Sequence, residues 1–168
     1  MSVLSKYVLD ANVFIQAARA YYAFDLAPAF WQALFDYASN GRLLSIDRVK
    51  EEIEQGKDEL AKWASGTFHK WFASTNENDV LQAYGGIMQW AQAQPQYSAA
   101  AKAEFADVKN ADAWLVAYAQ AKGYVVVTLE QPAPNAQRTI PIPNVCQAFS
   151  IPFIDSFAML RALGVKLG

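Results

Sequence analysis

Four carboxylates occur at positions where a folded α/β chain would gather them. Asp10 follows the apolar run 7–9, and Glu130 ends the apolar run 124–130. Asp112 and Glu52 each lie in the first half of a predicted helix. Clusters of oxygen ligands suit Mg²⁺ or Mn²⁺. Such an ion lowers the pKa of bound water and neutralises charge on a phosphate under in-line attack. The pattern therefore predicts metal-dependent chemistry on a phosphate ester.

The helical spacing around Asp112 places this acid on an apolar stripe. Leu115, Val116 and Ala119 follow it at i+3, i+4 and i+7, so all three share its face of the helix. That face must pack on the sheet, and an isolated buried charge is costly. The positive end of the helix offsets only about 0.3–1 kcal/mol of this cost. A bound cation would offset much more.

Two neighbouring acids compete for the fourth position. The helix that contains them has an apolar stripe at Val49, Ile53, Leu60 and Ala64. At about 100° per residue, Glu52 falls about 60° from Val49, beside the stripe, whereas Glu51 falls near the opposite face. We therefore assign Glu52 to the site, with Glu51 as the alternative.

Two polar residues accompany the carboxylates. Asn12 can hydrogen-bond beside Asp10 or cap the following helix, and Thr128 can orient a water or phosphate or serve as an ordinary strand residue. Each acid also has a structural explanation: a turn residue at Asp10, a second capping acid at Asp112, an exposed helix residue at Glu52 and the start of a loop at Glu130. The joint pattern is more specific than any single member.

The elements that must position these residues alternate between short strands and helices. Strands are predicted at 7–9, 43–46, 124–130 and 151–154. Helices are predicted at 28–39, at 48–64 after an Asp47 cap, at 111–122 between Asn110 and Gly123, and from an Asp155 cap to Gly164. The segment 67–108 reads as aromatic-rich helices with a loop near Pro95, and 131–144 as an ordered proline-rich loop.

This order of elements predicts one α/β domain with a mostly parallel sheet covered by helices on both faces. In such a sheet the carboxyl ends of the strands and the amino ends of the helices share one edge, where ligands bind. We expect the four acids to meet there. No linker divides residues 1–168.

The composition excludes several classes of protein. Charged residues make up 18% of the 168 residues and the formal net charge is −2, which excludes a disordered acidic tail and a protein that coats nucleic acid electrostatically. The chain has no apolar run of membrane-spanning length and no signal-like apolar run at its start, so we expect a cytoplasmic protein without a membrane span. Cys146 and His69 are the single residues of their types, and we expect both to be structural.

Assigning the four acids to one site changes the meaning of the net charge. Of 16 acidic residues, 12 then remain against 14 basic ones, so the rest of the chain is about +2. One divalent ion would bring the whole chain to neutral. The charge balance is thus compatible with a protein that cuts nucleic acid at a metal-filled acidic pocket.

The quoted segments resemble the PIN-domain nucleases, the fold of VapC-type toxins. The resemblance rests on YVLDANVFI, RVKEEI, NADAWLVAYA and VVVTLE, in this order, and it spans nearly the whole chain. The stretch after TLE resembles one PIN-like subfamily of poorly described function. The family's last motif commonly carries Asp where this chain has Glu130, and the helical insertion at about 67–108 is longer than in small VapC-like toxins.

The resemblance implies a five-stranded parallel sheet and a Mg²⁺- or Mn²⁺-dependent endoribonuclease. Asp10, Glu52, Asp112 and Glu130 would be the metal-binding acids, with Asn12 and Thr128 beside them. The products would be a 3′-hydroxyl and a 5′-phosphate. If the protein is the toxin of a toxin–antitoxin pair, an antitoxin should cover or distort the acidic edge. The insertion could form a clamp, a homodimer surface or an antitoxin surface.

Three other functions fit the topology. A haloacid-dehalogenase-like phosphatase needs a second acid two residues after the first, where this chain has Asn12. A receiver domain is compatible with Thr128, but no Lys follows the strand 151–154. A non-catalytic binding module could keep the fold without the activity, although the complete acidic set argues against it.

Overall fold

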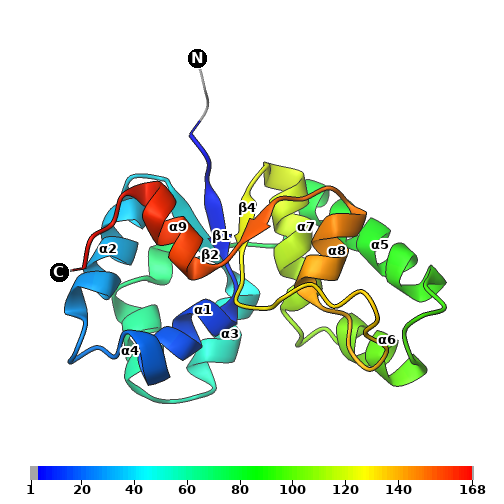
Figure 1. Ribbon diagram of the computed structural model, residues 1–168, viewed down its shortest axis with the longest axis horizontal. Helices are drawn as coiled ribbons and strands as arrows, with labels where there is room; N and C mark the ends of the chain where they lie inside the picture. Colours follow the sequence, from blue (N-terminus) through cyan, green and yellow to red (C-terminus); the bar gives the residue numbers. More distant parts are fainter. Residues whose placement is uncertain (1–3, 168) are drawn as a thin grey trace.

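The computed structural model describes residues 4–167 and contains a five-stranded sheet in which every strand pair is parallel. The strand order is β3-β2-β1-β4-β5, so the first strand of the chain lies at the centre (Figure 1). The predicted parallel α/β architecture is confirmed. The strands are β1 (Tyr7–Leu9), β2 (Leu43–Ile46), β3 (Phe72–Ala73), β4 (Val125–Val127) and β5 (Phe153–Ile154).

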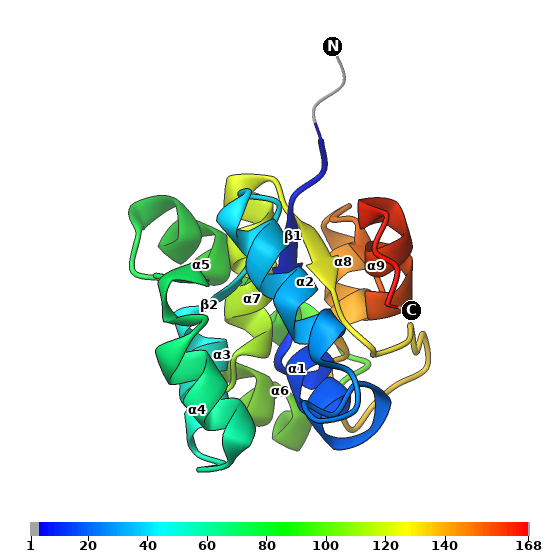
Figure 2. The same ribbon diagram turned by 90° about the vertical axis from the view of Figure 1, so that its left-hand side faces the viewer.

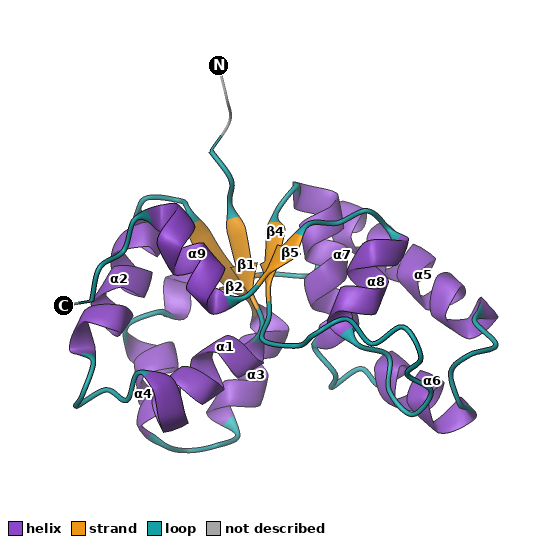
Figure 3. Ribbon diagram, in the orientation of Figure 1, coloured by secondary structure: helices purple, strands orange, loops and turns teal. Residues whose placement is uncertain are grey.

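Helices cover the sheet from two sides (Figure 3). One group contains α1, α2, α3, α4 and α9, and Figure 2 shows α2 in front of the sheet with α1 below it, where β1 ends. The other group contains α5, α6, α7 and α8. The helices are α1 (Ala11–Gln16), the π-helical η1 (Ala17–Tyr21), α2 (Pro28–Ser39), α3 (Asp47–Glu54), α4 (Glu59–Gly66), the 3-10 turn η2 (His69–Trp71), α5 (Asn78–Ala93), α6 (Ala99–Ala106), α7 (Asp112–Lys122), α8 (Ile142–Ala148) and α9 (Ser156–Leu163). Within residues 4–167, none of them is long and apolar enough to cross a bilayer.

Two central elements carry the core. Every residue of β1 is buried, because β1 has a paired strand on each side and helices on both faces. In α7 the seven residues 113–119 are all buried, so this helix packs on all sides rather than on one stripe. Gly123 ends α7 with a φ of 76°, which is favourable for glycine, and the chain then enters β4. Both elements present their site residue at the same edge of the sheet.

The predicted helix 48–64 is wrong in one respect, because the structure divides it into α3 and α4. The break includes Gly56 and Lys57. Lys57 has a φ of 50°, which lies outside the range of a right-handed helix, so the helix ends before it. Asp58 then caps α4 by accepting a hydrogen bond from the backbone of Ala61 at 3.0 Å. The sequence predicted one continuous helix because Glu54, Lys57 and Asp58 are all compatible with an exposed helix face.

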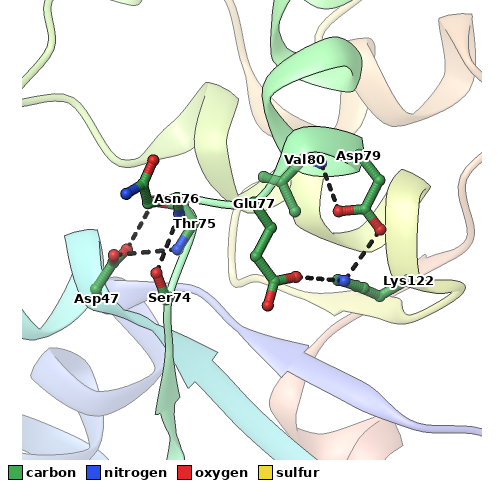
Figure 4. Close-up of polar contacts among 8 residues, drawn as sticks. All are labelled: Asp47, Ser74, Thr75, Asn76, Glu77, Asp79, Val80 and Lys122. Atoms are coloured by element: carbon green, nitrogen blue, oxygen red, sulfur yellow. Dashed lines mark hydrogen bonds and ion pairs between the residues drawn. The ribbon is translucent and has the colours of Figure 1, made fainter.

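Asp47 lies one position further into the helix than predicted, because it is the first residue of α3 and Ile46 occupies the N-cap position. Its carboxylate supports the first turn by accepting a hydrogen bond from the backbone N–H of Arg48 at 2.8 Å. The carboxylate also accepts hydrogen bonds from the backbone and the hydroxyl of Thr75, at 3.1 and 2.9 Å (Figure 4). This contact connects the start of α3 to the segment between β3 and α5.

The segments around residues 70 and 140 also differ from the prediction. Residues 69–71 form a single 3-10 turn, and Phe72–Ala73 forms the edge strand β3 rather than a helix. The proline-rich loop ends earlier than predicted, since α8 already begins at Ile142. Pro141 and Pro143 are compatible with this helix. The N–H groups of a first helical turn make no hydrogen bond within the helix, so the missing N–H of proline costs nothing there.

The long helix α5 of the predicted insertion is attached to α7 at two points. Lys122 pairs with Glu77 and, at 3.0 Å, with Asp79 (Figure 4). The rings of Tyr84 and Trp114 stack with their centroids 3.8 Å apart. The insertion therefore rests on the helix that begins at Asp112.

Candidate metal centre

An open cleft of about 340 Å³ lies where β1 and β4 end and α1 begins. All four predicted carboxylates line it, each from a different segment: the end of β1, the middle of α3, the start of α7 and the loop after β4. The lining residues are Asp10, Ala11, Asn12, Ile15, Gln16, Glu52, Asp112 and Glu130. The structure thus brings together acids separated by up to 120 positions in sequence.

Asp10 is held rigidly at the base of the cleft, with 5% of its surface exposed. One carboxylate oxygen accepts a hydrogen bond from the backbone N–H of Ala11 at 2.7 Å, which caps α1. The other oxygen accepts one from the hydroxyl of Thr128 at 2.8 Å. The backbone N–H of Asp10 donates to Val127 at 2.9 Å. The carboxylate is therefore oriented by β4 as well as by its own helix.

Thr128 is the centre of a small polar network. Its buried hydroxyl oxygen accepts hydrogen bonds from the side-chain amide of Asn12 at 3.3 Å and from the backbone of Glu130 at 3.2 Å. Asn12 in turn accepts a hydrogen bond from the backbone of Leu129 at 3.2 Å. The network fixes the turn that carries Glu130 relative to Asp10. In this structure Thr128 and Asn12 position the acids.

Asp112 and Glu52 complete the cleft from two helices. Asp112 is the first residue of α7, and its backbone N–H donates to the side chain of Asn110 at 2.9 Å. Asn110 thus supports the first turn, as predicted, although Ala111 occupies the N-cap position. Glu52 lines the cleft and its neighbour Glu51 does not, in agreement with the calculated angles on the helix.

The pKa values of all four acids are raised, chiefly by burial and, at Asp10 and Asp112, also by the neighbouring acids. Burial is the largest cause at Asp10 and raises its pKa from 3.8 to about 7; the Thr128 hydrogen bond lowers it, and the charges of Glu130 and Glu52 raise it further. The pKa of Asp112 lies well above 3.8 because of burial and then the charges of Asp10 and Glu130. Burial also raises the pKa of Glu52 and of Glu130. The charged forms of these acids are disfavoured, so the cleft favours the binding of a proton or a cation.

The carboxylates line the cleft without converging on one point. Across residues 4–167, no three acidic, histidine or cysteine side chains stand close enough to form a ready-made set of metal ligands. The two residues expected to be structural lie outside the cleft lining: Cys146 is buried, and burial raises its pKa to about 12, so it is a protonated thiol. His69 is the first residue of η2, is exposed and contacts the Gly66 carbonyl at 3.1 Å.

Sequence reasoning missed the extension of the cleft at both ends. A hollow of about 60 Å³ shares Ile15 and Glu52 with it and adds Arg19 and Asp58. A second hollow, of about 110 Å³, shares Asp112 and Glu130 and adds Glu104, Asn110 and Thr139 among its lining residues. The helical spacing of Asn12, Gln16 and Arg19 after Asp10 was the available signal for the first extension.

A larger hollow, of about 370 Å³, lies elsewhere and is lined mainly by aromatic rings of the α2 and α4 side, including Phe24, Trp31 and Trp63. It contains no acidic or basic residue. In contrast to the acidic cleft, that hollow therefore offers no carboxylate ligand for a metal ion.

The parallel five-stranded sheet, with helices on both faces and acids along its carboxyl edge, defines a PIN-like α/β fold. Comparison with known proteins gives the family: a family model described as "Domain of unknown function (DUF4411)" matches residues 7–167, and the chain belongs to this family.

Among solved structures, the chain is similar to one chain of the VapBC2 complex from Rickettsia felis, bound to a DNA fragment from its promoter. The TM-score is 0.53 at 12% sequence identity, and the match covers 89% of this chain and 97% of the other. This similarity confirms the predicted PIN-like fold. A comparison with curated proteins finds no match.

Proposed function

We propose that this protein is a metal-dependent endoribonuclease and the toxin of a type II toxin–antitoxin pair. One observation supports the chemistry above all others: four carboxylates from four segments line one cleft, and burial together with mutual repulsion raises the pKa of Asp10 to about 7. A fold gains no stability from such an arrangement. A divalent cation would make it favourable.

The donor set fits Mg²⁺ or Mn²⁺, because the candidate ligands are all carboxylate oxygens. Asp10, Asp112 and Glu130 would hold the ion, and two hydrogen bonds already orient Asp10. Glu52, on α3, would bind the ion through a water molecule or position the attacking water. When bound, the ion would supply a water of lowered pKa and charge neutralisation at the phosphate.

In the proposed reaction, water adds to the phosphorus and the bond to the 3′-oxygen breaks. The water's hydroxyl stays on phosphorus as part of the 5′-phosphate, and its second proton passes to the 3′-oxygen. Asn12 and Thr128 would keep Asp10 and Glu130 in place during this step through the hydrogen bonds described above. The opening of about 340 Å³ leaves room for a backbone phosphate and its sugar.

The proposed partner is an antitoxin that covers or distorts the acidic edge in the cytoplasm. The support is the fold shared with a chain of a VapBC toxin–antitoxin complex. The insertion at about 67–108 is the part of the chain where we expect an antitoxin or homodimer contact. Growth arrest on expression, relieved by coexpression of a neighbouring gene, would test this role separately from the chemistry.

Cleavage of single-stranded RNA by the purified protein tests the proposed activity. We expect cleavage with Mn²⁺, none with EDTA, and products ending in a 3′-hydroxyl and a 5′-phosphate. Asp112→Asn should abolish cleavage, because it removes a charge from the centre of the cleft while keeping the shape of the side chain. Glu51→Gln, the same kind of change one residue before Glu52, is the matched control and should cleave normally.

Cleavage that survives EDTA and Asp112→Asn would contradict the proposal. Binding of Mn²⁺ with no cleavage of RNA would favour the non-catalytic binding module, and phosphorylation of Asp10 by a small phosphodonor would favour a receiver-like function.

A further inference from the structure

Arg19 is the one positive charge among the described residues that line the cleft and its two flanking hollows. It lines the smaller hollow together with Glu52 and Asp58. Within residues 4–167 it makes no ion pair with either carboxylate, and its side chain is exposed. An arginine that stands among acids without pairing with them has its hydrogen-bond donors available to another anion.

The helical segment that follows Asp10 places Arg19 in the hollow beside the cleft. Asn12, Gln16 and Arg19 are spaced by four and three residues, and all three side chains line the cleft or its extension. Arg19 lies within η1, where the helix widens and Tyr22 donates to Ala17 five residues earlier, at 2.8 Å. Widened turns of this kind occur frequently at functional sites.

Two basic residues on α3, the helix that carries Glu52, are already engaged. Arg48 donates to the carbonyl of Val108 at 2.9 Å and lies over the Trp114 ring at 4.3 Å, so it supports the contact between α3 and α7. Lys50 pairs with Glu54 at 2.7 Å. Among the described residues that line the cleft and its two flanking hollows, Arg19 is therefore the one that can attract a polyanion, while the acids repel it wherever no metal ion intervenes.

We propose that Arg19 positions the RNA substrate by binding a backbone phosphate next to the scissile one. The inference rests on the proposed nuclease function and adds the direction in which the strand leaves the metal centre. Arg19 lies nine positions after Asp10, which corresponds to at most about 14 Å along the helix at 1.5 Å per residue, so Arg19 contacts a neighbouring phosphate and not the reacting one. The strand then runs from the four acids along α1 toward the hollow of Arg19.

Binding and cleavage of a single-stranded RNA oligonucleotide test this role. Binding is measured by fluorescence anisotropy in the Asp112→Asn background, which prevents turnover, over a series of salt concentrations. Arg19→Gln should weaken binding about tenfold at low salt, the usual effect of losing a charged hydrogen bond. It should also reduce the slope of log K against log salt by about 0.7, because one fewer counterion is released.

Two further variants separate this role from a general effect of charge. Arg161→Gln makes the same charge change on α9, outside the three hollows, and should leave affinity and slope unchanged. Arg19→Lys should keep the salt slope and recover part of the affinity, since it retains the charge but not the planar donor pair. In the active protein, Arg19→Gln should raise KM and leave kcat nearly unchanged, because a remote phosphate contact is equally strong in the ground and transition states.

The outcomes distinguish this inference from the proposed function. If the protein cleaves RNA but Arg19→Gln has unchanged affinity, salt slope and KM, the role of Arg19 is refuted and the nuclease function stands. If the protein does not cleave RNA, the nuclease function fails, and the binding series still decides whether Arg19 contacts the strand. Equal losses in Arg19→Gln and Arg161→Gln would also refute the proposal.

Discussion

Raising the pH should destabilise the metal-free protein, because Asp10 is buried with a raised pKa. Its pKa is 3.8 ordinarily and about 7 in the fold. Between these values the folded state binds more protons than the unfolded state, so the free energy of unfolding falls as the pH rises. The stabilisation is fully present below pH 3.8 and is lost as the pH rises through about 7.

The magnitude follows from the shift. At 1.36 kcal/mol per pKa unit, the whole shift corresponds to about 4 kcal/mol, of which about 2.5 kcal/mol is lost between pH 5 and pH 8. Asp112, Glu52 and Glu130 have raised pKa values as well and therefore act in the same direction. A divalent ion that binds the folded state at 100 times its Kd would restore about 2.7 kcal/mol at pH 8.

Urea unfolding in EDTA at pH 5, 6.5 and 8, repeated with Mn²⁺ at pH 8, measures both effects. Asp10→Asn should flatten the dependence on pH, whatever its effect on absolute stability, because no charge then develops at the base of the cleft. Asp79→Asn is the matched control: Lys122 lowers the pKa of Asp79, so this carboxyl titrates below the window and its loss should leave the slope intact. A free energy of unfolding that stays constant or rises from pH 5 to pH 8, or a slope that persists in Asp10→Asn, would refute the reasoning.

Two further predictions concern single positions. Thr128→Val should raise the pKa of Asp10 further, because it removes the hydrogen bond that lowers it, and should cost about 1–3 kcal/mol through the unpaired polar groups it leaves. Urea titrations across pH would show a higher transition pH, and an unshifted one would contradict the role of the hydroxyl. Lys57→Gly should stabilise the protein by about 0.5–1 kcal/mol, because Lys57 has a φ of 50° that glycine adopts freely. Thermal unfolding would measure this gain, and Lys62→Gly inside α4 should instead cost about 1 kcal/mol.

The sequence was most informative where periodicity and capping agreed. The strand 7–9 and the helix 28–39 have the predicted bounds, and α9 begins after its Asp155 cap and ends before Gly164, as predicted. Asp10, Asp112 and Glu130 were placed at one edge for a related reason: strand ends and helix starts share an edge in a parallel sheet, so residues at those positions line the same edge. Glu52, in the middle of α3, was chosen from the angles on its helix.

The errors arise where tertiary contacts outweigh local pattern. The strand β3 has two residues and pairs with β2 only, so the aromatic run around it is equally compatible with a helix. The break between α3 and α4 depends on one backbone angle at Lys57, and the role of Asp47 depends on Thr75, 28 residues away. The shape of the cleft beyond the acids likewise depends on which side chains of α1 and α6 reach it, and periodicity alone does not determine that.

The electrostatics of the cleft distinguish a ligand site from structural use of the same residue types. An acid that stabilises a fold is placed where its charge is favoured, as at Asp79, whose pKa is lowered by Lys122. Asp10 and Asp112 have the opposite character, because burial and neighbouring acids disfavour their charged forms. A turn residue or a capping acid would not require this cost, and raised pKa values of this kind concentrate at functional sites. The cost of holding these acids together is therefore a further argument for the cation site that we propose.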